Sequence, residues 1–239
     1  MISIKRLIHR CSIAILLVSG CTSTFEPRLT SLDASKPGLP GAKEVHAGVE
    51  VSIEEFASPD KSRRAFDAEV ASRGVLPLLV RIENNSAANY AVRRNEIVVT
   101  ANGRPLAPLY GFEAADLGAS RNGTWNALVN TAMAGPLAMF FWPATLAGTA
   151  SQTQKVNRQI ERHFESLELT DTLLKPGEKL VGFVYTHMPD GSSWGSTTVG
   201  ITLSPETGEE IETKPLNFQL TFLGTGSLLS ERLSKSAAP

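Results

Sequence analysis

The stretch Leu216-Asn217-Phe218-Gln219-Leu220-Thr221-Phe222 alternates apolar and polar side chains at every position. Successive side chains of a β-strand point to opposite faces, so this period of two predicts a strand with one buried face and one wet face. Residues 49–54 show the same alternation. The pattern indicates a chain built mainly from half-buried antiparallel strands.

The rest of residues 44–223 adds extended segments separated by turn residues. Leu76-Pro77-Leu78-Leu79-Val80-Arg81-Ile82 predicts a strand with its proline near the start, and residues 180–185 and 198–203 predict two more. Asn102-Gly103 is a strong hairpin signal between residues 97–99 and 104–109. About seven short strands with such turns predict a mainly β fold, an antiparallel β-sandwich.

An apolar segment interrupts this pattern. Residues 122–154 carry no charge, and residues 127–150 are long enough to cross a bilayer. However, Pro136 and Pro143 divide the segment, which favours an inserted helical hairpin at about residues 113–168 over a straight span. Pro143 is expected at the first turn of a helix that continues into a polar region. Its apolar stripe is Val156, Ile160, Phe164 and Leu167.

Three alternatives remain open for the insertion. It packs on the sandwich as ordinary core, or it contacts the bilayer or a partner's groove, or it spans the membrane. The residues expected to make the membrane or partner contact are Leu137, Met139, Phe140, Phe141 and Trp142.

The N-terminus carries a basic start, an apolar run at residues 13–18, and Val18-Ser19-Gly20-Cys21. This box resembles the bacterial lipobox. The resemblance implies cleavage between Gly20 and Cys21, a diacylglyceryl thioether on Cys21, and a further acyl chain such as palmitate on the new amino group. Two or three acyl chains anchor a protein stably. Because Thr22 stands where an aspartate would signal retention at the inner membrane, the expected location is the outer membrane, facing the periplasm.

Processing has consequences for the mature chain. Residues 1–20 hold three basic and no acidic residues, so their removal changes the net charge from −1 to −4. This mild acidity disfavours nucleic acid as a partner. Cys11 leaves with the signal peptide, so no disulfide or cysteine metal site is expected. Residues 21–43 are predicted to be a flexible tether, and residues 224–239 a disordered tail.

No catalytic, metal or cofactor site is expected. Gly191-Ser192-Ser193-Trp194-Gly195 matches a hydrolase elbow but precedes a strand, where the elbow needs a helix. The histidines of the mature chain, His46, His163 and His187, lack ligand spacing. The doublets Arg63-Arg64 and Arg93-Arg94 are interpreted as solvated turns or strand ends, with an anion site as the alternative.

Leu174-Lys175-Pro176-Gly177-Glu178 leads into Gly182-Phe183-Val184-Tyr185. With the strand and turn at residues 76–85, this pattern resembles bacterial envelope lipoproteins of uncharacterised function. The resemblance implies an immunoglobulin-like sandwich with a helical insertion. It also implies a lipid-anchored, non-enzymatic protein that has a structural role or binds an envelope protein partner. The alternative is a membrane-inserting or transport- or secretion-assembly factor that acts through residues 127–150.

Overall fold

The computed structural model describes residues 24–33, 41–120, 138–188, 195–206 and 214–223. The chain divides into two compact units. One comprises residues 1–26 and 121–159, and the other comprises residues 27–120 and 160–239. We call the second unit the sandwich domain.

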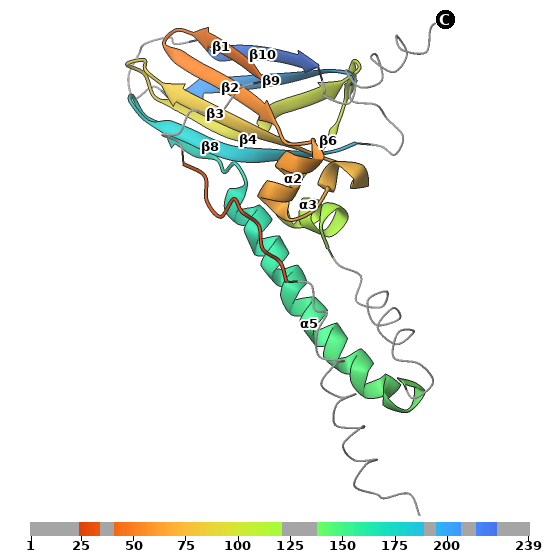
Figure 1. Cartoon of the computed structure of the whole chain (residues 1–239). Helices are drawn as coiled ribbons and strands as arrows, with labels where there is room; N and C mark the ends of the chain where they lie inside the picture. The colour runs from red at the N-terminus through yellow and green to blue at the C-terminus, as the bar shows by residue number, and fades with distance from the viewer. Residues whose placement is uncertain (1–23, 34–40, 121–137, 189–194, 207–213, 224–239) are drawn as a thin grey trace, which may run out of the picture. The chain divides into compact units, whose positions relative to one another are not determined.

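Two antiparallel sheets form the sandwich domain (Figure 1). The first sheet runs in the order β1 (Ala42–His46), β2 (Val49–Glu55), β3 (Val75–Asn84), β8 (Lys179–His187) and β6 (Ala107–Leu109). The second runs in the order β10 (Leu216–Leu223), β9 (Ser196–Pro205), β4 (Tyr90–Ala101) and β5 (Arg104–Pro105). A short strand, β7 (Thr172–Leu174), also pairs with β4.

The core between the sheets follows from the period-two pattern. In β10, Phe218, Leu220 and Phe222 are buried while their polar neighbours are exposed. By contrast, β3 is apolar on both faces: Leu76, Leu78, Val80 and Ile82 point into the sandwich core, and its other side is covered as well. A strand that is buried on both faces needs a continuous apolar run, which explains its sequence.

Helices cover the outer face of the first sheet. They are α2 (Pro59–Phe66), a 3-10 turn η1 (Val70–Arg73), α3 (Gly111–Gly118) and the last turns of α5 (Ala138–Leu167). Phe66 and Phe164 pack with ring centroids 4.6 Å apart, and Phe66 lies 5.1 Å from Phe183 of β8. Tyr185 donates its hydroxyl to the Phe164 carbonyl at 3.1 Å. This aromatic layer fixes the end of α5 on the sandwich domain.

The predicted mainly β antiparallel sandwich is confirmed, with ten strands in the described ranges where about seven were expected. The additional strands are short, because β5, β6 and β7 are fragments of two or three residues. The Asn102-Gly103 turn is also confirmed: it joins β4 to β5, with φ of 51° and 75° at its two residues.

The insertion differs in one respect from its prediction. The helix α5 begins at Ala138, ahead of Pro143, so the proline lies in its second turn and removes one backbone hydrogen bond. The other arm of the predicted hairpin falls on residues outside the described ranges. Among the helices that are described, none is sufficiently long and apolar to cross a membrane.

Part of the predicted tether contacts the sandwich domain. The backbone N–H groups of Arg28 and Leu29 donate to the Arg64 carbonyl of α2, at 2.9 and 3.0 Å. The Arg81 guanidinium donates to the Asp33 carbonyl at 3.3 Å. Residues 27–33 therefore lie on the domain that follows them.

Candidate binding groove

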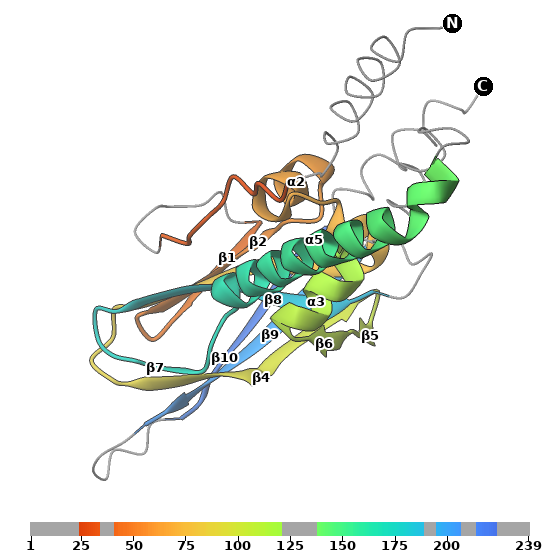
Figure 2. The same ribbon diagram turned by 90° about the horizontal axis from the view of Figure 1, so that it is seen from below.

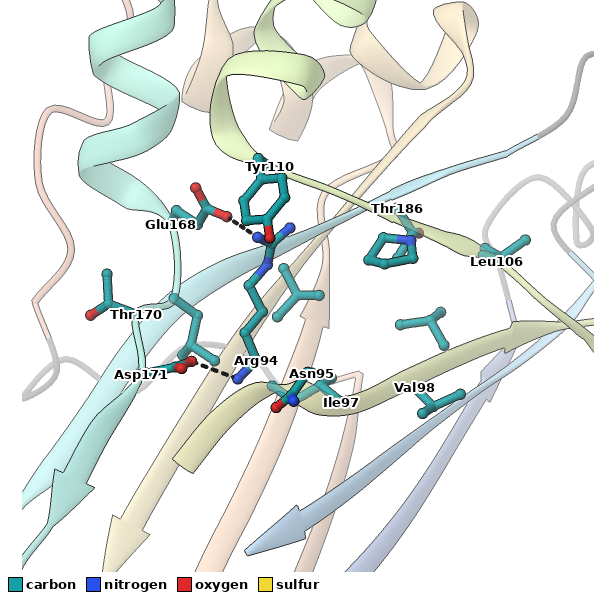
Figure 3. Close-up of a pocket in the computed structure, with 14 residues that line it drawn as sticks. Arg94, Asn95, Ile97, Val98, Leu106, Tyr110, Glu168, Thr170, Asp171 and Thr186 are labelled. Atoms are coloured by element: carbon teal, nitrogen blue, oxygen red, sulfur yellow. Dashed lines mark hydrogen bonds and ion pairs between the residues drawn. The ribbon is translucent and has the colours of Figure 1, made fainter. Parts of the chain in front are cut away.

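A groove of about 730 Å³ opens between the two sheets of the sandwich domain (Figure 3). It lies between β4 of one sheet and β6 and β8 of the other, with the segment after α5 at its end. Its walls are largely apolar, with Ile97, Val99, Leu106, Leu169 and Val184 among the lining residues. Small-molecule and peptide sites commonly have a volume of about 300–1,000 Å³ and apolar walls with a few polar groups.

The β4 strand is irregular where it borders the groove. Its register with β9 shifts between Val92 and Ile97, so residues 93–96 bulge out of the ladder. On the edge of β4 that faces away from β9, two short strands pair with it. The pairing with β7 covers Tyr90 to Val92, and the pairing with β5 covers Thr100 and Ala101. Figure 2 shows β7 and β5 at opposite ends of β4. The Leu106 N–H also donates to the Val99 carbonyl at 2.8 Å, so residues 93–98 are the part of β4 that pairs with no described strand on the groove side.

Arg94 lies within this bulge and extends along the groove (Figure 3). Its Nη1 lies 3.0 Å from Glu168 Oε1, and its Nη2 donates to the Leu109 carbonyl. The guanidinium also stacks over the Tyr110 ring, 4.1 Å from the centroid. The side chains of Arg94 and Glu168 are only 15% and 14% exposed. The guanidinium is thus held on three sides.

Glu168 is placed by the end of α5 and by a glycine in β8. The backbone N–H of Leu169 donates to the Phe183 carbonyl at 2.9 Å, which lays this segment on β8. A Cβ at Gly182 would lie 2.5 Å from Leu169 Cα, so only glycine permits the close approach. Glu168 Oε2 also accepts the Gly111 N–H at the start of α3, at 2.8 Å.

Two polar groups that line the groove have no hydrogen-bond partner among the described residues. They are Arg94 Nε and the hydroxyl of Thr186 in β8. Thr186 is 2% exposed. A buried polar group without a partner is costly and uncommon, which calls for an explanation at each site. Arg94 Nε can only donate, whereas the hydroxyl can donate or accept. Both atoms are closed off from solvent, so an acceptor on a ligand would reach them only after the side chains that cover them shift.

The neighbouring titratable groups are held neutral. Burial raises the pKa of Tyr185 well above its ordinary value, and the Glu168 charge adds to this while Arg94 opposes it. Burial lowers the pKa of His163, partly offset by the hydrogen bond to Ala65. His163 Nε2 donates to the Ala65 carbonyl at 2.7 Å. At neutral pH both side chains therefore serve as uncharged donors to backbone carbonyls.

The lining of the groove, as far as the chain is described, includes none of the site residues predicted from sequence. Gly20, Cys21 and Leu137 lie outside the described residues, as does the serine motif up to Trp194. Met139, Phe140, Phe141 and Trp142 belong to α5, but the structure does not describe their side chains. Their contact with a membrane or a partner stays a prediction.

The three histidines of the predicted mature chain lie on different elements of the fold. His46, His163 and His187 lie on β1, α5 and β8. In the described part of the chain, no three His, Cys, Asp or Glu residues gather as metal ligands.

The sequence interpretation missed Arg94, which was assigned to a solvated turn or strand end. The structure shows the inward positions changing from even, at Tyr90 and Val92, to odd, at Ile97 and Val99, which requires a bulge around Arg94. The sequence did not show this change, because residues 90–92 and 97–99 are each apolar throughout. No signal pointed to Glu168 or Thr186 either.

Beside the groove, α3 presents an apolar surface. Tyr110 and Phe112 are exposed, and their rings stack with centroids 6.0 Å apart and an interplanar angle of 11°. Leu117 on the same helix is exposed as well. Large apolar side chains that cluster on a surface often mark a contact site.

The chain has one distant structural neighbour and no detectable sequence relative among the proteins compared. No family model matches the chain, and no curated protein sequence is detectably similar to it. Among solved structures, the chain is similar to "a putative lipoprotein (ycdA) from Bacillus subtilis", at 9% sequence identity and a TM-score of 0.37. The match covers 80% of this chain and 41% of that protein, so the chain spans less than half of the other's length. A likeness at this score carries no argument about function.

Proposed function

We propose that this chain is a lipid-anchored protein of the bacterial cell envelope whose sandwich domain binds another protein in the groove. The anchor is the acylated Cys21, and the protein faces the periplasm from the outer membrane. The observation that carries the binding role is the groove itself. It combines apolar walls, an unpaired stretch of β4, and unpartnered polar groups on Arg94 and Thr186.

The chemistry of the groove favours binding over catalysis. Its charged groups already have partners: the Arg94 guanidinium lies 3.0 Å from Glu168, and Asp171 Oδ1 accepts the backbone N–H of Arg94 at 2.8 Å. The residues that line the groove include no histidine, cysteine or serine. The lining does hold hydroxyls and two carboxylates, but Glu168 and Asp171 are already engaged by the guanidinium and the backbone N–H of Arg94.

The anchor is tested by fractionation of the full chain and its Cys21→Ala variant, the latter exported by a replacement secretory signal. Wild-type protein is expected in the membrane fraction, and the variant in the soluble fraction. Retention of the variant on membranes after a high-salt wash would contradict the acyl anchor as the sole attachment.

The groove is tested by site-specific photo-cross-linking in cells. Val98 lines the groove and is 53% exposed, whereas Val45 on β1 is not among the groove's lining residues and is 55% exposed. A photo-reactive side chain at residue 98 is expected to form a discrete protein adduct, and the same group at residue 45 is the matched control. Equal adducts at both positions, or none at residue 98, would refute the binding role.

A second candidate is a membrane-inserting or assembly role for residues 127–150. The observation that favours it is the exposed surface of α3, formed by Tyr110, Phe112 and Leu117, which directly precedes the charge-free residues 122–154. Flotation of the Cys21→Ala chain with vesicles of phosphatidylethanolamine and phosphatidylglycerol tests it. Binding that Phe112→Ser weakens, and that the control Leu173→Ser leaves intact, would support this role. Absence of flotation would exclude it.

A further inference from the structure

Building on the proposed function, we propose that the partner enters the groove as an extended peptide segment that adds a β-strand to β4 at Ile97, within residues 93–98. The mode of binding would be strand addition, in which backbone hydrogen bonds supply affinity and alternate side chains supply specificity. Four features of the sandwich domain support it.

The first feature is the direction of the β4 backbone groups. In an antiparallel ladder, the N–H and C=O of successive residues point alternately to the two sides of the strand. The Val99 carbonyl accepts the Leu106 N–H at 2.8 Å, so Val99 faces the groove side. Val98, opposite Gly200, therefore faces β9, and Ile97 again faces the groove. The N–H and C=O of Ile97 are available to an added strand.

The second feature is the length of the gap. Pairing with β7 ends at Val92, and at the other end the Leu106 N–H occupies the Val99 carbonyl, so the gap spans residues 93–98. At roughly 3.3 Å per residue, and with the bulge shortening the straight part, the gap admits a segment of about four residues. A gap of this length can receive a short peptide segment, whereas the full edge strand of a partner's β-sheet would be too long for it.

The third feature is the pair of unpartnered polar groups. Arg94 Nε needs an acceptor and the Thr186 hydroxyl can use one, and both become available once the side chains that cover them shift on binding. Backbone carbonyls of an extended peptide are regularly spaced acceptors. An apolar side chain of the same peptide would lie against Leu106, Leu169 and Val184. The groove thus offers both kinds of contact that an alternating strand presents.

The fourth feature is charge. The groove lining holds the carboxylates of Glu168 and Asp171 and the single guanidinium of Arg94, which Glu168 already neutralises. An acidic side chain on the peptide would therefore meet an excess of negative charge. The segment that fits is apolar on its inward face and carries no acidic residue there.

The test uses the full chain in detergent micelles and a phage-displayed library of random peptides. The most enriched peptide is synthesised, and its binding is followed by residue-resolved amide hydrogen exchange. We expect the Ile97 amide to exchange fast in the free protein and slowly in the complex. The Val98 amide faces β9, so it is expected to exchange slowly in both states.

Two chemical changes sharpen this test. N-methylation of alternate peptide amides should weaken binding by at least about tenfold for one set of alternating positions, and little for the other. Thr186→Val removes the unpartnered hydroxyl and should weaken binding several-fold. Thr202→Val on β9, whose hydroxyl donates to Asn217 on the outer face, is the matched control and should leave binding unchanged.

Several results would overturn the proposal. These are a selection without enriched peptides, a bound peptide that leaves Ile97 unprotected, and equal effects of both N-methylation sets. If Ile97 is already protected in the chain alone and loses this protection in a chain that ends at Leu223, the occupant is residues 224–239 and not a partner. If the cross-link at residue 98 persists while these tests fail, the groove still binds a partner, but not by strand addition.

Discussion

The ion pair between Arg94 and Glu168 predicts a measurable coupling between the two side chains. Glu168→Gln, Arg94→Met and the double variant form a thermodynamic cycle. The Glu168→Gln change keeps the acceptor for the Gly111 N–H but removes the charge that faces Arg94. The guanidinium then stays in a largely buried site without its counter-charge.

The geometry sets the size of the effect. At 3.0 Å and an effective dielectric constant of about 20, the two charges attract each other by about 5–6 kcal/mol. Withdrawal of both groups from water offsets much of this attraction. Because each side chain keeps about 15% of its exposure, water also screens the pair. We expect a coupling energy of about 2 kcal/mol, and a loss of about 2–3 kcal/mol in the free energy of unfolding for Glu168→Gln alone.

Urea unfolding followed by circular dichroism measures all four free energies. The pair Lys179–Glu83 is the control, because its atoms lie 2.9 Å apart but the side chains are 43% and 31% exposed. Its coupling should be below about 1 kcal/mol. The reasoning would be refuted by a coupling for Arg94–Glu168 that is no larger than that of the exposed control.

Three further predictions concern the packing that holds the site. Phe164→Ala should lower the free energy of unfolding by about 3–5 kcal/mol in the same urea assay, because the ring is fully buried against Phe66 and Tyr185. The exposed Phe112→Ala should change it by no more than about 0.5 kcal/mol. Gly182→Ala should cost about 1–3 kcal/mol, because its Cβ meets Leu169 backbone at 2.5 Å, whereas Gly200→Ala, with its nearest atom at 3.8 Å, should be tolerated. A Gly182→Ala protein as stable as wild type would contradict the close approach. Burial lowers the pKa of His163 below 6.5, so the unfolded chain binds the proton first as the pH falls. Stability should therefore drop below about pH 6.5, and His163→Gln, which keeps a donor for Ala65, should reduce this drop in unfolding curves at several pH values.

The sequence was informative where local rules decide the structure. Alternation predicted β2 and β10, Asn102-Gly103 predicted the hairpin, and the buried positions Ile160, Phe164 and Leu167 followed from helical spacing. The groove depends instead on contacts between residues far apart in the chain. Nothing local to Arg94 indicates that Glu168 will face it, because the pair forms only when the end of α5 lies on β8 beside Gly182.

An arginine side chain can either be solvated at the surface or form a buried ion pair, and its local sequence does not distinguish the two. An arginine in a polar doublet is solvated at most strand ends, and only the bulge turns Arg94 inward here. The inward positions change from even to odd across this bulge, but residues 90–92 and 97–99 are each apolar throughout, so the sequence did not show the change. Thr186 left no trace, because a threonine in a strand is common on either face.

The open edge of β4 has a consequence for self-association. An unpaired strand edge is a template on which copies of a protein can stack into aggregates. Such stacking needs a flat segment of about six or seven residues with little charge. In β4 the free edge is interrupted by the bulge, carries the Arg93–Glu96 ion pair at 3.0 Å, and ends at β7 and β5. The edge is long enough to receive a short guest strand, yet too short and too charged to be a good template for a fibril.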